Sequence, residues 1–202
     1  MDWVQIRKQP MKRILPAILL AGSLMSARAT LFQYTVNFSS AGEALPSTAT
    51  GSGTVNYDDV AHSLALSCNF SGLLGTTTAS HIHAPTASAF TGNANVATTL
   101  PSFAGFPLGV SSGTFSSVLD LTQSSSWNPS FVSGNGGTTA TAETAFAGFI
   151  ASGKAYWNIH TTYATGGEIR AFLVAVPEPG MLSLALLGGI GFLARARKAA
   201  KA

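Results

Sequence analysis

The chain has 202 residues, enough for one ordinary domain plus terminal processing segments. Its net charge is +3 and its pI about 9.2, but nine of the eleven basic residues lie before residue 30 or after residue 194. Between residues 30 and 176, two basic residues stand against six acidic ones, a balance of −4. A nucleic-acid-binding domain is therefore excluded, because nothing in this central part could neutralise a row of phosphates.

The N-terminal residues 1–29 have the layout of a secretory signal peptide. A basic start precedes an apolar run over residues 14–25, and Ala-Arg-Ala at 27–29 fits the small-x-small cleavage pattern. We predict export of the chain and cleavage by signal peptidase after Ala29. Met11 is an alternative start, because the ten residues before it add nothing that such a signal needs.

The domain between the terminal segments, residues 30–175, is rich in Gly, Ser, Thr and Ala. Apolar and polar side chains alternate over residues 32–38 and 64–70, which predicts two half-buried strands. Helical spacing of apolar residues over 141–151 predicts one short helix. The expected fold is mostly β, an antiparallel sandwich or barrel of about seven strands, whose five remaining strands are placed at residues 53–57, 79–83, 114–121, 155–160 and 168–174.

Two further features bound this domain. Residues 86–107 and 123–139 are rich in Gly, Ser, Asn and Pro and are expected to form long loops, which are commonly functional or mobile. The single cysteine, Cys68, excludes a disulfide within the chain and falls on the apolar face of the predicted strand 64–70. We expect a buried, inert thiol.

Histidines in two predicted strands are the candidate site. His81 and His83 are two residues apart in a strand and therefore project from one face. In the strand 155–160, Trp157 and Ile159 take the apolar face, which leaves His160 on the polar face. If the two strands are neighbours, three of the four histidines of the chain converge.

Two interpretations of these residues stay open. In one, His81, His83 and His160 bind copper or zinc as neutral imidazoles, and Glu168 or a water molecule completes the site. In the other, the histidines join Asn158, Glu168 and Arg170 in a polar network that ties strand ends together, with Glu168 and Arg170 as a charge pair. The polar network is the interpretation we favour from the sequence. The fourth histidine, His62, is expected to be a solvated surface residue.

The C-terminal residues 176–202 have three successive parts. Pro177, Glu178 and Pro179 are followed by an apolar segment over residues 181–194, predicted as a transmembrane helix, and then by the basic residues Arg195, Arg197 and Lys198. This order resembles the PEP-CTERM sorting tail. The resemblance implies recognition by an exosortase, a membrane-embedded protease, so that the tail anchors the protein at least transiently.

The central domain resembles the CHRD domain, a repeat first recognised in chordin. The similarity rests on His-Ile-His-Ala-Pro at 81–85, Lys-Ala-Tyr-Trp-Asn-Ile-His-Thr at 154–161 and Gly-Gly-Glu-Ile-Arg at 166–170, in that order. The chain departs from the family pattern at Ala84, often Gly, and at Trp157, usually a smaller β-branched residue. The His-x-His strand also resembles the metal strand of copper-zinc superoxide dismutase, although the bridging aspartate of that enzyme is not evident.

The sequence predicts a noncatalytic protein of the cell surface or extracellular matrix. Motifs of hydrolases, phosphate-binding loops and paired carboxylates are not found in it. The expected location is the cell envelope and then the cell surface, with exopolysaccharide as a candidate partner. The alternatives are a copper- or zinc-binding or redox module, and a domain that binds a polysaccharide or protein through Tyr156, Trp157 or the long loops.

Overall fold

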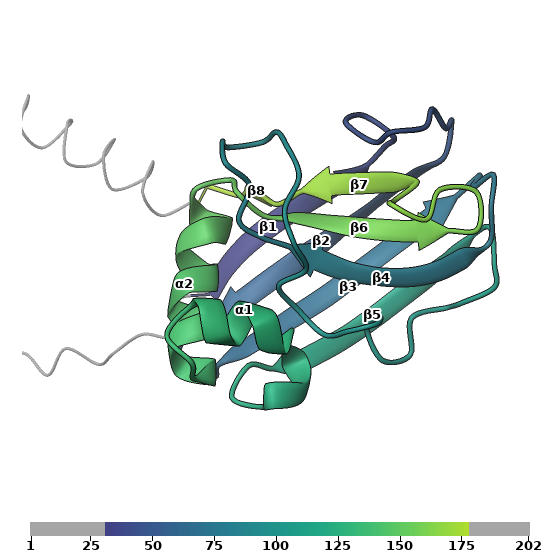
Figure 1. Ribbon diagram of the computed structural model, residues 1–202. Coiled ribbons are helices and arrows are strands. Elements are labelled where there is room, and N and C mark those ends of the chain that lie inside the picture. Colours follow the sequence, from purple (N-terminus) through teal and green to yellow (C-terminus); the bar gives the residue numbers. More distant parts are fainter. Residues whose placement is uncertain (1–30, 178–202) are drawn as a thin grey trace, which may run out of the picture.

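The computed structural model describes residues 31–177 of the 202-residue chain, which form two antiparallel sheets and a small group of helices (Figure 1). The larger sheet has the strand order β5-β3-β2-β1-β8, and the smaller one the order β4-β6-β7. The elements are β1 (Leu31–Phe38), β2 (Thr50–Asp58), β3 (Ser63–Ser71), β4 (Thr77–His83), β5 (Gly113–Asp120), η1 (Ser124–Ser126), α1 (Pro129–Gly134), α2 (Thr139–Ala151), β6 (Tyr156–Thr161), β7 (Ile169–Phe172) and β8 (Val174–Ala175).

The larger sheet follows the alternation of its sequence. Along β3, the four side chains that alternate from Leu64 to Phe70 are buried, and the residues between them are partly or fully exposed. The same holds for Tyr34, Val36 and Phe38 of β1. Because successive side chains in a strand point to opposite faces, this pattern gives one face to the core and one to solvent.

The smaller sheet packs its apolar face on the larger one. Trp157 of β6 is fully buried, and its ring contacts Phe38 of β1 edge-on at a centroid distance of 5.4 Å. Phe103 and Phe115 complete the aromatic group around it, at 5.8 and 6.2 Å. Edge-to-face contacts of this kind add to the burial of apolar area, so Trp157 lies at the centre of the packing between the sheets.

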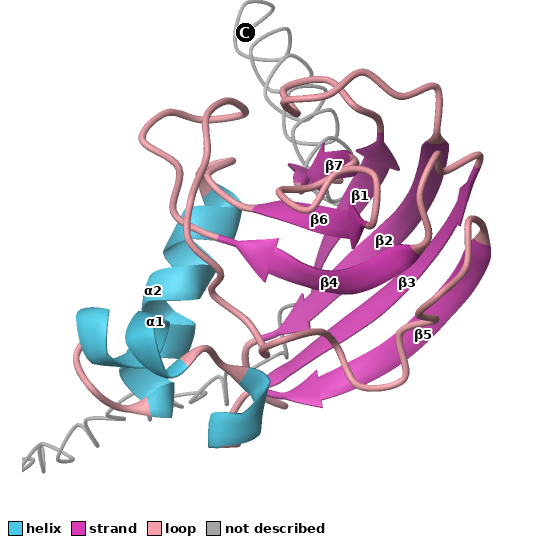
Figure 2. Ribbon diagram, turned by 45° about the vertical axis from the view of Figure 1, so that its right-hand side comes forward, coloured by secondary structure: helices cyan, strands magenta, loops and turns pink. Residues whose placement is uncertain are grey.

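Both helices lie together at one end of the sandwich (Figure 2). The helix α2 begins after Thr138, whose hydroxyl accepts the Thr141 backbone N–H in a reciprocal capping box. The helix α1 begins after Asn128, whose side chain accepts the Ser130 N–H, with Pro129 in the first turn. Its buried Phe131 stacks on Trp127, so the helices close the core at this end.

A long loop after β4 covers the free edge of that strand. Its Ala97 N–H donates to the Ile82 carbonyl, and its Phe103 N–H donates to the Ser80 carbonyl. Before that, residues 90–94 cross the outer face of β6 and β7 (Figure 1), where the Gly92 carbonyl accepts a bond from Arg170. The outer face of the smaller sheet is thus covered by a loop and is not open to solvent.

Most of the predicted elements are confirmed, with three differences. The structure is a two-sheet sandwich and not a closed barrel. The predicted strand 168–174 is two strands, because the chain leaves β6 at the buried Leu173 and pairs with β1 of the other sheet through β8. Within the described residues there are two α-helices where one was expected, since α1 lies inside the predicted loop 123–139.

The predicted signal peptide and sorting tail lie outside the described residues. This includes the expected transmembrane helix at 181–194 and the basic residues after it. Within residues 31–177, no helix is long and apolar enough to cross a membrane.

Candidate functional site

Three histidines meet on the outer face of the smaller sheet. β4 and β6 are antiparallel neighbours, with Ala79 opposite His160 and His81 opposite Asn158. The ring centroids of His81 and His160 are 4.6 Å apart, and those of His81 and His83 are 4.8 Å apart. One ring nitrogen from each of the three histidines lies within 4.8 Å of the others. The convergence predicted from the sequence is confirmed.

Each ring is oriented by a backbone carbonyl from a loop. The Nδ1 atoms of His81, His83 and His160 lie 3.1, 2.8 and 2.9 Å from the carbonyl oxygens of Pro101, Ala94 and Thr165, respectively. A carbonyl oxygen can only accept a hydrogen bond, so each Nδ1 carries the proton that it donates. In a neutral ring, the Nε2 atom is then an unprotonated acceptor.

The Nε2 atoms are left without complementary partners. The Nε2 atoms of His81 and His160 face each other at 2.9 Å, although both are acceptors in the tautomer that the carbonyls impose. His83 Nε2 is fully buried and has no hydrogen-bond partner. A buried polar atom without a partner costs about 1–3 kcal/mol, and two facing lone pairs require a proton or a cation between them.

A proton is disfavoured at this position. Burial and, to a smaller extent, the neighbouring His160 and His83 together lower the pKa of His81 to about 3. Burial likewise lowers the pKa of His83 to about 4 and lowers that of His160. All three rings are therefore neutral near pH 7, which is the form in which imidazole binds metal ions.

Tyr156 and Arg170 form the wall behind His83. The Tyr156 ring stacks on the His83 ring at 4.8 Å with an interplanar angle of 4°. The Arg170 guanidinium carbon lies 4.9 Å from the centroid of the same tyrosine ring. Arg170 in turn donates to the Gly92 carbonyl and to Asn93 Oδ1, both at 2.9 Å. This stack fixes the His83 ring in its position.

The structure does not assemble the predicted polar network in the predicted form. Arg170 pairs with Glu43, with Nε and Oε1 3.3 Å apart, and not with Glu168. Asn158 donates from its Nδ2 to the Gly166 carbonyl at 3.3 Å. These contacts tie the strand end to its turn, but neither of them involves an Nε2 atom of the three histidines.

The Glu168 carboxylate makes its hydrogen bonds with groups other than the three histidines. Its fully buried carboxylate accepts bonds from the backbone N–H groups of Leu74 and Gly75 and from the hydroxyls of Ser47 and Thr161. Burial raises the pKa of this carboxyl, but the four hydrogen bonds outweigh burial and lower it overall. It joins three loops to β6. Of the two completing ligands considered in the metal-binding interpretation, Glu168 or a water molecule, Glu168 is therefore not available.

Two other expectations concern single side chains. Cys68 is buried, as predicted, and burial raises the pKa of its thiol to about 12, so it is not a nucleophile. His62 is half exposed, but its Nδ1 contacts the Glu143 carboxylate at 2.9 Å, and Tyr57 donates to the same carboxylate. This pairing could not be predicted from the sequence, because Glu143 lies 81 residues away in α2.

The arrangement has the composition of a three-histidine metal centre. With metal–nitrogen distances of about 2.0–2.1 Å, tetrahedral geometry places ligand nitrogens about 3.3 Å apart. The facing Nε2 atoms of His81 and His160 are 2.9 Å apart, and the three candidate ligand nitrogens lie within 4.8 Å of one another. The second nitrogen of each ring donates to a carbonyl, which is the usual outer contact of a metal-bound histidine. Among the described residues, these histidines form the one group of three or more side chains able to hold a metal ion.

Comparison with known proteins identifies the family of this domain. The model of the CHRD domain matches residues 34–173, more than half of the chain. The chain therefore belongs to the CHRD domain family. Searches of curated proteins and of solved structures found no match.

Proposed function

We propose that the CHRD domain of this chain binds one copper or zinc ion through the Nε2 atoms of His81, His83 and His160. The observation that carries the proposal is that one ring nitrogen from each of three histidines lies within 4.8 Å of the others, while a loop carbonyl occupies the Nδ1 side of each ring. A bound cation would replace the unfavourable contact between acceptors with three metal–nitrogen bonds. Imidazole nitrogen is a preferred ligand of both metals.

The purely structural interpretation accounts less well for the same contacts. In a satisfied polar network, each ring would have a complementary partner at both nitrogens. Here one side of each ring is satisfied, whereas His83 Nε2 is buried and unpaired. Three protein ligands also leave a fourth coordination position, as in metal sites that keep a water molecule. We assign the site a binding role and no reaction.

The test is direct measurement of the metal. The protein, purified without a polyhistidine tag, is analysed for bound copper and zinc, stripped with a chelator and titrated with each metal by calorimetry. We expect one ion per chain, and a gain in unfolding free energy of about 2.7 kcal/mol when free metal is one hundred times its Kd. His83→Leu should abolish both effects.

His62→Gln is the matched control, because His62 lies outside the histidine group and should leave metal binding unchanged. The proposal is wrong if neither metal binds the stripped protein. It is equally wrong if His83→Leu and the native protein bind the same amount.

We propose in addition that the domain is exported, sorted to the cell envelope and displayed at the cell surface or in its matrix. The support is the signal-like layout of residues 1–29 and the PEP-CTERM-like order of residues 176–202. Signal peptidase and an exosortase would process the two ends, and the apolar segment 181–194 would hold the chain in the membrane until cleavage. A surface display role without catalysis fits a domain built around one binding site.

Fractionation tests this location. A tagged chain with and without residues 177–202 is expressed in a bacterium that contains an exosortase. We expect the complete chain in the envelope fraction and the truncated chain in the periplasm or medium. Recovery of both chains from the cytoplasm would contradict the proposal.

A further inference from the structure

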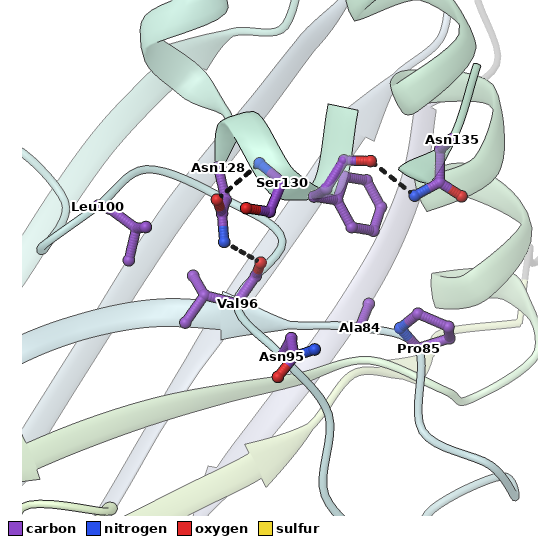
Figure 3. A pocket seen from close by; sticks show the side chains of 9 residues that line it. Ala84, Pro85, Asn95, Val96, Leu100, Asn128, Ser130 and Asn135 are labelled. Carbon is purple, nitrogen blue, oxygen red and sulfur yellow. Dashed lines mark hydrogen bonds between the residues drawn. The ribbon is translucent and has the colours of Figure 1, made fainter. Parts of the chain in front are cut away.

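A pocket lies beside the histidine site, between the loop that follows β4 and the start of α1 (Figure 3). Its volume is about 540 Å³, within the range of small-molecule sites. The loop over residues 94–96 separates the two features. Its Ala94 carbonyl accepts a bond from His83, and its Val96 carbonyl accepts one from Asn128 at the pocket. The pocket is thus a distinct site.

The described residues that line the pocket are uncharged. One part of the lining is apolar and includes Pro85, Val96, Leu100 and Phe131. The other part consists of amide and hydroxyl side chains, among them Asn95, Ser130 and Asn135. A charged ligand would lose its hydration here without gaining a counter-charge, which is unfavourable. The pocket therefore favours a neutral ligand.

Several polar groups at the pocket have no partner in the described part of the protein. The side chains of Asn95 and Ser130 make no hydrogen bond there, and both are exposed. Asn135 donates from its Nδ2 to the Phe131 carbonyl at 2.8 Å, which leaves its Oδ1 free to accept. A wholly apolar ligand would cover these groups without pairing them, at a cost.

The wall of the pocket is fixed before any ligand binds. Asn128 uses both ends of its amide, since its Oδ1 accepts the Ser130 N–H at 3.0 Å and its Nδ2 donates to the Val96 carbonyl at 2.8 Å. The Phe131 side chain is buried and stacks on Trp127. Figure 3 shows the two hydrogen bonds of Asn128 at the pocket. A preformed wall lowers the ordering cost of binding.

We propose that this pocket binds a neutral saccharide. A sugar ring presents hydroxyl groups at its edges, which can pair with Asn95, Ser130 and Asn135, and C–H groups on its faces, which can pack on Leu100 and Pro85. The exposed rim, where 48% of Leu100 is accessible, allows one end of a longer chain to enter. This inference goes beyond metal binding and does not depend on it.

The test uses neutral trisaccharides as probes: maltotriose, cellotriose, mannotriose and a β-galactotriose, each titrated into the purified protein by calorimetry or NMR. Trigalacturonate and an uncharged tripeptide serve as the charged and the peptide probe. We expect at least one neutral trisaccharide to bind and both other probes to fail. Stripping the metal, or the change His83→Leu, should leave the saccharide affinity unchanged.

Three variants locate the binding. Asn95→Ala and Ser130→Ala each remove one exposed hydrogen-bonding group and should weaken binding about three- to tenfold. Leu100→Trp fills the mouth of the pocket and should abolish binding. Asn69→Ala, an exposed amide on β3 of the other sheet, is the control and should change nothing. Thermal unfolding verifies that each variant is folded.

The proposal fails if none of the four neutral trisaccharides binds. It also fails if they bind with an affinity that neither Asn95→Ala nor Leu100→Trp alters, because the ligand would then lie elsewhere. Tighter binding of trigalacturonate or of the tripeptide would assign the pocket to another class of ligand and likewise overturn it.

Discussion

Apolar and polar residues alternate in both sheets of this domain, but the polar face is exposed in the larger sheet and buried in the smaller one. In the larger sheet, alternation separates a buried apolar face from an exposed one carrying Ser, Thr and Asn. In the smaller sheet, β6 also alternates apolar and polar residues, yet all of its residues except His160 are buried. The difference arises because loops cover the outer face of the smaller sheet, as the bond between Arg170 and the Gly92 carbonyl illustrates.

This contrast explains where the candidate site lies. Polar side chains on the exposed face of the larger sheet stay hydrated, so they lose little free energy on folding. Polar side chains on the smaller sheet have lost water and must pair with the covering loops. Most of them do so. The buried atoms of this sheet without a hydrogen-bond partner are His83 Nε2, Asn158 Oδ1 and Arg170 Nε, and the Nε2 atoms of His81 and His160 face each other. Unpaired polar atoms on a buried face therefore indicate a candidate ligand-binding site.

The largest expected effect tests the core between the sheets. Trp157→Ala removes a fully buried side chain that contacts three other aromatic rings, and should lower the free energy of unfolding by about 3–5 kcal/mol. Val118→Ala, at an exposed position of β5, should cost less than about 0.5 kcal/mol. Denaturant unfolding measures both. Equal losses would contradict the assignment of the buried face.

The second effect is a dependence on pH that comes from the smaller sheet. An unfolded histidine with a pKa near 6.5 takes up a proton below that pH, whereas His81 and His83 remain neutral in the fold to about pH 3 and 4. The metal-free protein should therefore have its full stability above pH 6.5 and lose about 1 kcal/mol per histidine for each pH unit below it. Unfolding curves from pH 7.5 to 5 measure this slope.

The variant His83→Leu is the control for that slope, which should become shallower because one buried histidine is missing. The carboxyl groups of Asp120 and Glu168 do not interfere, since their pKa values are lowered and lie below this window. A stability that does not change between pH 6.5 and 5 would show that the rings accept protons in the fold.

A third, smaller effect concerns the carboxylate that joins the loops to β6. Glu168→Gln replaces one acceptor oxygen with a donor that faces N–H and O–H groups, and should cost about 2 kcal/mol. Because the folded pKa of Glu168 is lowered, its contribution is present above about pH 4.5 and is lost as the pH falls. Asp120→Asn, at an exposed carboxylate, provides the comparison in the same unfolding experiment.

The smallest expected effect is the change in unfolding free energy that His83→Leu causes in the metal-free protein. His83→Leu exchanges a buried ring with an unpaired Nε2 for an apolar side chain and gives up one bond to the Ala94 carbonyl. We expect the unfolding free energy of the metal-free protein to change by less than about 1 kcal/mol, while stabilisation by copper or zinc disappears. A loss above 3 kcal/mol without metal would instead favour a structural role for the histidine.

Sequence reasoning found most of the strands because their apolar residues alternate, as in β1 and β3. It missed α1, although Asn128 and Pro129 are a good helix start, because the surrounding Gly, Ser and Asn residues indicate a loop. It paired Glu168 with Arg170 because they are two residues apart. The structure gives them different partners, since Glu43 comes from a distant loop that sequence spacing does not reveal.

The sequence by itself determined that two strands carry His81, His83 and His160 and that these side chains share the polar face of their strands, because the period of a strand is fixed by backbone geometry. It also identified the family through three separated motifs. Only the tertiary structure decided which ring nitrogen is free. The carbonyls of Pro101, Ala94 and Thr165 that set the tautomers belong to the backbone of loops, and a backbone carbonyl has no signature in the sequence.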